Sequence, residues 1–226
     1  MPSPSPRRRR AAPTPAPAPS GGPRQAVLDA ARVLFVREGL DGLTVRRIAE
    51  RAGLTTMAVY THWQGRDGLL GALYDEGVAT LAAAQARALS ALPPEATPVE
   101  RVQALCRAFR ETAHGAPHHY ALMLGGTSHA FHPPAESAAR ALATLATLEE
   151  AVAAALVQAL GTSDAARHAA TIARQLFAFC HGWVALEQAR MLGSQAYGET
   201  SSGIAPGAPP DAYTTAIAAL LRVPAA

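Results

Sequence analysis

The sequence contains no lysine, so all twenty of its basic residues are arginine. It has only two cysteines, Cys106 and Cys180, which excludes a disulfide-stapled scaffold and fits a reducing cytoplasm. We expect no residue run to be long and apolar enough to span a bilayer. No glycine-rich phosphate loop, nucleophile elbow or Ser/His/Asp series is visible. These absences predict a cytoplasmic protein that is not an enzyme, uses no cofactor and has no membrane partner.

Alanine is abundant, while proline and glycine gather at a few places along the chain. This composition predicts an all-α fold, which we expect to comprise about nine helices around a good apolar core.

Charge is distributed unevenly. Residues 1–68 hold eleven arginines and five acidic residues, a net charge of +6, whereas residues 69–226 hold nine and twelve, a net charge of −3. A basic amino-terminal third is typical of a nucleic-acid-binding segment.

Residues 44–63 have the pattern of two short helices joined by a tight turn. Four apolar residues recur at i, i+3, i+4 and i+7 and so share one face of the first helix: Val45, Ile48, Ala49 and Ala52. We expect Gly53 to end that helix, because glycine adopts the left-handed conformation without steric cost. The hydroxyl of Thr55 is suited to cap the next helix. This order of elements indicates a helix-turn-helix. An upstream helix that we expect to end at Gly39 completes a three-helix head, with a small core of Leu34, Phe35, Leu43, Ile48, Val59 and Trp63. Further along the chain, Thr97 is suited to cap a helix that Pro98 opens.

The outer face of the predicted second helix carries neutral hydrogen-bonding groups and no acidic residue. Its members are Thr55, Thr56, Met57, Tyr60, Thr61 and His62. Such groups suit a surface that lies against base edges and phosphate oxygens, where a carboxylate would be repelled. The alternative is a partly buried helix that packs on another domain.

These residues carry a family resemblance. Leu43–Gly53, Tyr60–Trp63 and Arg66–Leu70 resemble the DNA-binding region of the tetracycline-repressor (TetR) family of bacterial regulators, over about residues 24–74. The chain departs from the family at Met57, where a small residue or proline is frequent, and at Arg66, where lysine is frequent. The resemblance implies the following DNA-binding set: Thr44, Arg46, Thr55, Thr56, Met57, Tyr60, Thr61, His62 and Arg66. Within it, Tyr60 and His62 are implied to contact phosphates.

The resemblance also implies a division into three parts. Residues 1–22 are a basic, proline-rich arm that we expect to be disordered, and that either follows the DNA backbone or is simply solvated. Residues 23–68 form the helix-turn-helix DNA-binding domain. Residues 69–226 form a ligand-binding and dimerisation domain, in which Leu176–Trp183 is similar to a His-Gly-containing helix of one subgroup.

Six residues of this last part suit a mainly apolar cavity with a few polar groups: His119, Met123, Phe131, Phe177, His181 and Trp183. The alternative is ordinary core packing. Gly182 is notable because a glycine inside a helix costs about 1 kcal/mol and usually reflects close approach of another group. Eight residues could form the family's four-helix dimer contact or the core of one subunit: Ala173, Leu176, Ala178, Leu186, Tyr213, Ile217, Leu220 and Leu221.

Five histidines crowd one region: His114, His118, His119, His129 and His132. His114 and His118 have the spacing of helical metal ligands, but Gly115 and Pro117 lie between them and should break the helix, so no metal is expected.

The sequence therefore predicts a homodimeric repressor that a small-molecule effector releases from a pseudo-palindromic double-stranded DNA operator. The alternatives are a metal- or redox-responsive DNA binder and a helical small-molecule-binding protein without a DNA role.

Overall fold

A computed structural model describes residues 21–124, 131–160, 162–190 and 210–221 of the chain. Within these ranges the chain forms nine α-helices and no strand, which confirms the predicted all-α class. They are α1 (Gly22–Glu38), α2 (Val45–Ala52), α3 (Thr56–Trp63), α4 (Arg66–Ser90), α5 (Pro98–Gly115), α6 (Pro117–Leu124), α7 (Ala135–Leu160), α8 (Thr162–Gln188) and α9 (Pro210–Leu220). Nearly all of the predicted arm and His129 lie outside the described residues.

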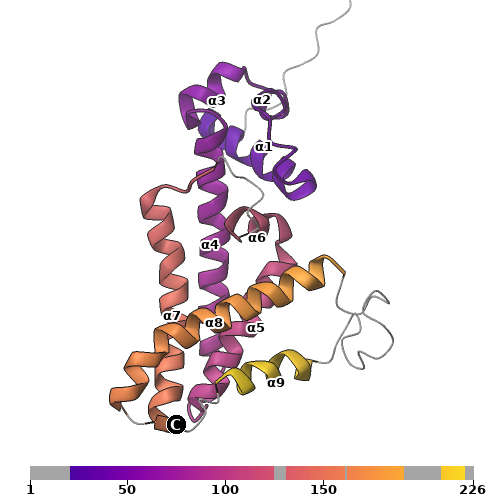
Figure 1. The fold of residues 1–226 in the computed structure, drawn as a ribbon. Coiled ribbons are helices and arrows are strands. Elements are labelled where there is room, and N and C mark those ends of the chain that lie inside the picture. The colour runs from indigo at the N-terminus through magenta and orange to yellow at the C-terminus, as the bar shows by residue number, and fades with distance from the viewer. Residues whose placement is uncertain (1–20, 125–130, 161, 191–209, 222–226) are drawn as a thin grey trace, which may run out of the picture.

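The helices are arranged as a small head on a long bundle. Helices α1, α2 and α3 gather at one end, and α4 runs from this head along the length of the molecule (Figure 1). Helices α5, α6 and α7 pack against α4, and α8 packs on α7 and α5 and crosses them obliquely. Helix α9 covers the far end of α5. Because α4 belongs to both parts, it is the main covalent and packing link between them.

Local sequence explains where several helices begin and end. Gly39 and Gly53 have φ values of 65° and 68° and end α1 and α2, as predicted. Thr97 and Glu100 form a reciprocal capping box at the start of α5, in which the Thr97 amide donates to Glu100 Oε2 over 2.7 Å. Thr55 occupies the cap position of α3, but its hydroxyl accepts no hydrogen bond from the helix, so the predicted side-chain cap is absent.

Two hydrophobic cores fill the molecule. The head core contains all six residues predicted for it: Leu34, Phe35, Leu43, Ile48, Val59 and Trp63. Leu69, Leu70 and Leu73 extend this core along α4. The first turns of α4 therefore belong physically to the head.

The bundle core contains five of the eight residues considered for a dimer contact: Ala173, Leu176, Tyr213, Ile217 and Leu221. These five are therefore core residues of a single chain. The other three are Ala178, Leu186 and Leu220, and they remain exposed. Tyr213 fixes α9 on α5, because its hydroxyl donates a hydrogen bond to the carbonyl oxygen of Cys106 over 3.0 Å.

Helix α7 corrects one expectation from the sequence. Its stretch Ala135–Gln158 is long and apolar enough to cross a membrane, with a mean hydropathy of 1.4. A core helix of a helical bundle meets the same criterion when it is rich in alanine and leucine. The buried residues Leu148, Val152 and Leu156 of α7 belong to the bundle core, which accounts for part of this hydropathy. The rest lies on a face that a single chain leaves open.

Candidate nucleic-acid interface and interior cavity

The outward face of α3 projects from a firmly anchored helix. Val59 and Trp63 face inward with exposed fractions of 0% and 9%. The Trp63 indole N–H donates to the carbonyl oxygen of Arg24 over 2.9 Å, and the Arg24 guanidinium lies 4.1 Å from the ring centroid. On the other side, Met57 is 69% exposed and Tyr60 is 55% exposed. The helix therefore presents its outer side chains from a rigid support.

The hydroxyl-bearing residues predicted for this surface are brought together. Thr55, Thr56 and Thr61 are exposed beside Met57 and Tyr60, while His62 is half-buried. The Tyr60 ring lies over Gly65, where an added Cβ would come within 3.0 Å of Tyr60 Cε1. Gly65 has a φ of 95°, so glycine is favoured there for its backbone as well. The phenol is thus held at the edge of the exposed face.

Two arginines of α2 are balanced by acidic neighbours. Arg46 pairs with Glu50 over 2.8 Å, and both side chains are largely exposed. Arg47 donates to both carboxylate oxygens of Glu38, and this hydrogen bonding is the largest cause of the lowered pKa of Glu38. Exposed pairs of this kind contribute little to stability. Arg46 is therefore free to exchange Glu50 for a phosphate at small cost.

Arg66 and Thr44 are engaged within the head. The Arg66 guanidinium donates to the carbonyl oxygens of Leu43, over 2.8 Å, and Leu40, over 3.1 Å. The Thr44 hydroxyl caps α2 by accepting from the Arg47 amide over 3.3 Å. The structure does not bring Arg66 together with the exposed face of α3. Its described contacts hold the loop between α1 and α2.

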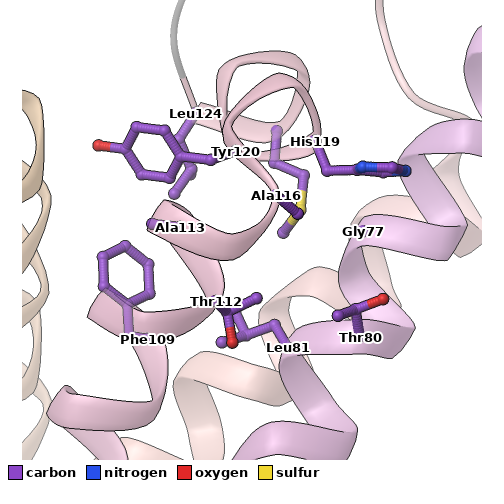
Figure 2. A pocket seen from close by; sticks show the side chains of 11 residues that line it. Gly77, Thr80, Leu81, Phe109, Thr112, Ala113, Ala116, His119, Tyr120 and Leu124 are labelled. Carbon is purple, nitrogen blue, oxygen red and sulfur yellow. The ribbon is translucent and has the colours of Figure 1, made fainter. Parts of the chain in front are cut away.

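A small interior cavity lies where α4, α5 and α6 meet (Figure 2). Its volume is about 20 Å³, which is room for roughly one water molecule. The wall consists of Gly77, Thr80, Leu81, Phe109, Thr112, Ala113, Ala116, His119, Tyr120, Met123 and Leu124. None of these side chains is a carboxylate, guanidinium or ammonium. Burial lowers the pKa of His119, so this imidazole is neutral at physiological pH.

Tyr120 joins this cavity to α8. Burial raises the pKa of Tyr120 to about 12, so the phenol stays protonated. Its oxygen lies 2.7 Å from Nδ1 of His181 and also donates to the His181 carbonyl oxygen over 3.2 Å. His181 therefore holds Tyr120, which lines the cavity, but does not line the cavity itself.

Of the six residues predicted to bind a ligand, two line this cavity, namely His119 and Met123. Phe177 lines a second cavity of about 20 Å³, which shares Leu81 and Phe109 with the first. Phe131 packs on Tyr74 with ring centroids 6.2 Å apart, in the head core. Trp183 packs on Phe179 and Tyr213, each with centroids 5.5 Å apart.

Several lining residues were missed from the sequence, above all Gly77, Thr80 and Thr112. Gly77 and Thr80 lie in α4, which is rich in leucine and alanine, and Thr112 lies in α5. A Cβ at Gly77 would lie 2.8 Å from Met123 Sδ and 3.2 Å from His119 Cβ, so this glycine makes room for α6. Gly77, inside α4, was the sequence signal that could have located this cavity, by the same reasoning that singled out Gly182.

An open groove of about 660 Å³ runs along the surface between α4 and α5. It shares Thr80, Thr112 and Ala116 with the interior cavity. Its rim carries the charged residues Arg87, Arg107 and Glu111. Only short side chains thus separate the groove from the closed cavity.

Those of the crowded histidines that the structure describes do not converge on one site. His114 accompanies Arg110 in binding Glu187, with His114 Nε2 2.7 Å from the carboxylate. His118 lies against Gly39, and His119 lies edge-on to Phe35 with centroids 4.9 Å apart. In the described part of the chain, no three His, Cys, Asp or Glu side chains are grouped to hold a metal ion.

The two cysteines meet in the bundle core, where both are 2% exposed and line the second cavity. The hydrogen bond between the thiols is the largest cause of a raised pKa at Cys106 and a lowered pKa at Cys180. In Cys106 burial adds to the rise. The pair is shielded from solvent, which favours a packing role.

Comparison with known proteins identifies both parts of the chain. The sequence pattern of the bacterial regulatory proteins of the tetR family matches residues 27–73. The pattern of the tetracyclin repressor-like C-terminal domain matches residues 102–202.

Curated relatives match over a limited length. The HTH-type transcriptional repressor Rv1474c of Mycobacterium tuberculosis is 36% identical over 64 residues, which cover 28% of this chain and 34% of that protein. The class C tetracycline repressor protein of Escherichia coli is 44% identical over 50 residues, covering 22% of this chain and 23% of that repressor. The matched part thus spans about a third or less of these relatives.

Solved structures match over nearly the whole chain. A protein of unknown function from Rhodococcus sp. RHA1 has a TM-score of 0.68 at 29% identity, covering 91% of this chain and 97% of that one. A TetR variant from Acinetobacter baumannii AYE in complex with minocycline has a TM-score of 0.53 at 22% identity, covering 86% and 92%, and shares the fold. With a helix-turn-helix head, a matching C-terminal domain and this common architecture, the chain belongs to the TetR family of bacterial regulatory proteins.

Proposed function

We propose that this protein is a homodimeric, cytoplasmic transcriptional repressor that a small molecule releases from a pseudo-palindromic DNA operator. The observation that carries the proposal is the exposed, acid-free face of α3 on a rigid three-helix head. A recognition helix needs such a face, because it must lie against base edges and phosphates without repelling them. The names of the relatives, several of which are transcriptional repressors, support the same function.

In this proposal α3 enters the major groove. Thr55, Thr56 and Met57 are at its amino-terminal end, where the residues of a recognition helix reach bases. Tyr60, Thr61 and His62 then face the phosphates beside the groove. Thr44 and Arg46 contact the DNA backbone from the start of α2, and Arg66 positions the loop before it.

The dimer is proposed to form through the open faces of α7 and α8. On α8 the residues Ala178, Gly182, Ala185 and Ala189 follow one another at helical spacing on the side away from the core. A Cβ at Gly182 would meet nothing within 4 Å in the described part of the chain, so this glycine leaves room for a second subunit to approach closely. On α7 Leu142 is 65% exposed. A twofold pair would space the two α3 helices by about 34 Å, one helical turn of DNA.

The proposed effector site is the interior cavity at α4, α5 and α6. Its lining favours a compact, uncharged and mainly apolar molecule, because a buried charge would find no counter-ion on the wall. Entry is proposed from the α4–α5 groove, past Thr80, Thr112 and Ala116. Since ligand pockets have volumes of about 300–1,000 Å³, the present cavity must widen before it can hold an effector.

Helix α6 is the proposed coupling element between cavity and head. One face of α6 lines the cavity through His119 and Met123. The same helix touches α1, because His118 lies against Gly39 and the His119 ring meets Phe35 edge-on. An effector that widens the cavity must push α6 toward these contacts. The head then changes its position relative to the head of the other subunit.

Effector and operator favour different states in this scheme, so each must weaken the other by the same factor. The decisive test starts from genomic fragments that the purified protein retains, which supply an operator. We expect Tyr60→Ala to weaken binding to this operator and to unrelated DNA alike, by about tenfold per half-site, because a charge-assisted hydrogen bond to phosphate contributes about 1.5 kcal/mol. Tyr60→Phe keeps the ring and removes only the hydroxyl, so it should lose the same phosphate contact as Tyr60→Ala.

Two outcomes would contradict the proposal. Retention of full operator affinity by Tyr60→Ala would remove the assigned phosphate contact. Binding to random duplexes that does not fall with added salt would argue against any DNA role, because phosphate neutralisation gives a steep salt dependence. Loss of binding after peroxide or chelator treatment would instead indicate a redox- or metal-responsive regulator.

A further inference from the structure

The exposed face of α3 lacks the side chains that make the strongest direct contacts to bases. Bidentate recognition of guanine uses Arg or Lys, and bidentate recognition of adenine uses Asn or Gln. From Thr56 to Trp63 the helix contains none of these four residue types. Gln64 follows at the carboxyl-terminal cap, at the opposite end of the helix from the residues expected to reach bases. Sequence discrimination by α3 must therefore rest on other contacts.

Met57 is the feature of this face that the fold does not explain. Its exposed fraction of 69% is the highest among the exposed large apolar side chains of the described residues. It is the second residue of α3, within the first turn, and no residue of the head core packs on it. Leaving an apolar side chain in water has a free-energy cost, which contact with an apolar partner would recover.

Only one base-pair group in the major groove matches such a side chain. The 5-methyl group of thymine projects into the groove, and apolar side chains contact it there. Methionine is unbranched and polarizable, so it can adapt to the position of that methyl group. The neighbouring threonines supply hydroxyl groups that bond to several bases and discriminate weakly between them.

Resting on the proposed function, we infer that Met57 determines operator specificity by packing on a thymine methyl group. Each operator half-site then carries an A·T pair opposite the amino-terminal end of α3. The methyl group is the feature recognised, so 5-methylcytosine in the same place substitutes for thymine. The contact adds affinity for a particular position and leaves binding to phosphates unchanged.

The test uses the full-length protein and two randomised duplex libraries that are identical except that one contains uracil in place of thymine. Selection from the thymine library should give half-sites with one invariant A·T pair. Replacing that single thymine by uracil in the selected duplex should weaken wild-type binding by about fourfold per half-site, the value expected for one buried methyl group. Exchanging the pair for 5-methylcytosine·G should restore more affinity than exchanging it for C·G.

Variants of Met57 test whether this residue causes the preference for thymine over uracil. Met57→Ala should bind thymine and uracil duplexes equally, whereas Met57→Leu should keep the preference. Val36→Ala is the matched control, because Val36 is 64% exposed on α1 and lies off the α3 face. Both sites are exposed, so all three variants should fold.

The outcomes separate the inference from the proposed function. If selection enriches no duplex and binding is insensitive to salt, the DNA-binding function itself fails. If a duplex is enriched but uracil substitution has no effect at any thymine, Met57 does not recognise a methyl group. The inference is equally overturned if Met57→Ala still prefers thymine over uracil.

Discussion

The head places its candidate functional side chains outside its core, whereas the bundle places its candidates inside. In the head the core is closed, and the candidate residues such as Met57 and Tyr60 stand on its outside. In the bundle the candidate residues line a cavity inside the core, among leucine, alanine and phenylalanine side chains. A polar surface is conspicuous in a sequence, because it breaks the usual charged pattern of an exposed helix. A cavity wall has the same composition as a core.

The first prediction tests whether the head core is more tightly packed than the bundle core. Phe35 is fully buried in the head, so Phe35→Ala should lower the free energy of unfolding by about 3–5 kcal/mol. Phe177 is half-buried beside an existing cavity, so Phe177→Ala should cost clearly less. Urea unfolding followed by Trp63 fluorescence in a Trp183→Phe background measures the head, and Trp183 fluorescence in a Trp63→Phe background measures the bundle. Equal losses for the two variants would mean that the cores do not differ in packing.

The second prediction concerns the ion pair that joins α5 to α8 in the bundle. Arg110 donates to both oxygens of Glu187, over 2.9 Å at Oε2. Arg110→Met leaves this carboxylate, whose side chain is 14% exposed, without its main partner. We expect a loss of about 1.5–3 kcal/mol in urea unfolding at neutral pH. The surface pair variant Arg46→Met is the control and should cost less than 1 kcal/mol.

The pH dependence of the same pair has a definite sign. Burial acts to raise the pKa of Glu187, but hydrogen bonds from Arg110 and His114 outweigh it, and the net shift is downward. A lowered folded-state pKa gives stability that is present above the unfolded value, near 4.5, and is lost as the pH falls through the folded value. Wild type should therefore lose its advantage over Arg110→Met below about pH 4.5. An advantage that persisted unchanged to pH 2 would contradict this assignment.

The third prediction compares two glycines inside long helices that have opposite surroundings. Gly182→Ala should raise the unfolding free energy of a dissociated subunit by about 1 kcal/mol, because its Cβ meets nothing among the described residues. Gly77→Ala should gain less, since its Cβ would press on Met123 and His119. In the proposed dimer Gly182→Leu should also weaken subunit association, which sedimentation at several concentrations measures. Unchanged association would place the dimer contact elsewhere.

The smallest expected effect concerns the coupling through α6. Gly77→Ala adds one methyl group at the point where α6 meets α4, so it should change effector sensitivity with little change in operator affinity of the free protein. Titrating the operator complex with a panel of compact uncharged compounds would measure this. Loss of operator affinity without any effector would indicate that the substitution disturbs the head directly.

Much of the fold followed from sequence alone. The six head-core residues, the helix-ending Gly39 and Gly53 and the capping Thr97 were all predicted from the sequence. These features depend on neighbours within one or two helical turns, so periodicity and capping chemistry determine them. The acid-free face of α3 was also visible, because it too is a property of a single helix.

The tertiary structure decided everything that depends on contacts between distant helices. It turned Arg66 toward Leu40 and Leu43, placed Trp183 against α9, and formed the cavity from Gly77, Thr80 and Thr112. It also distinguished two glycines that look equivalent in sequence. Side chains of α6 occupy the space beside Gly77, whereas the space beside Gly182 is empty in the described part of the chain. A local pattern tells which side of a helix is buried but not what it is buried against. That choice is made only when the helices pack.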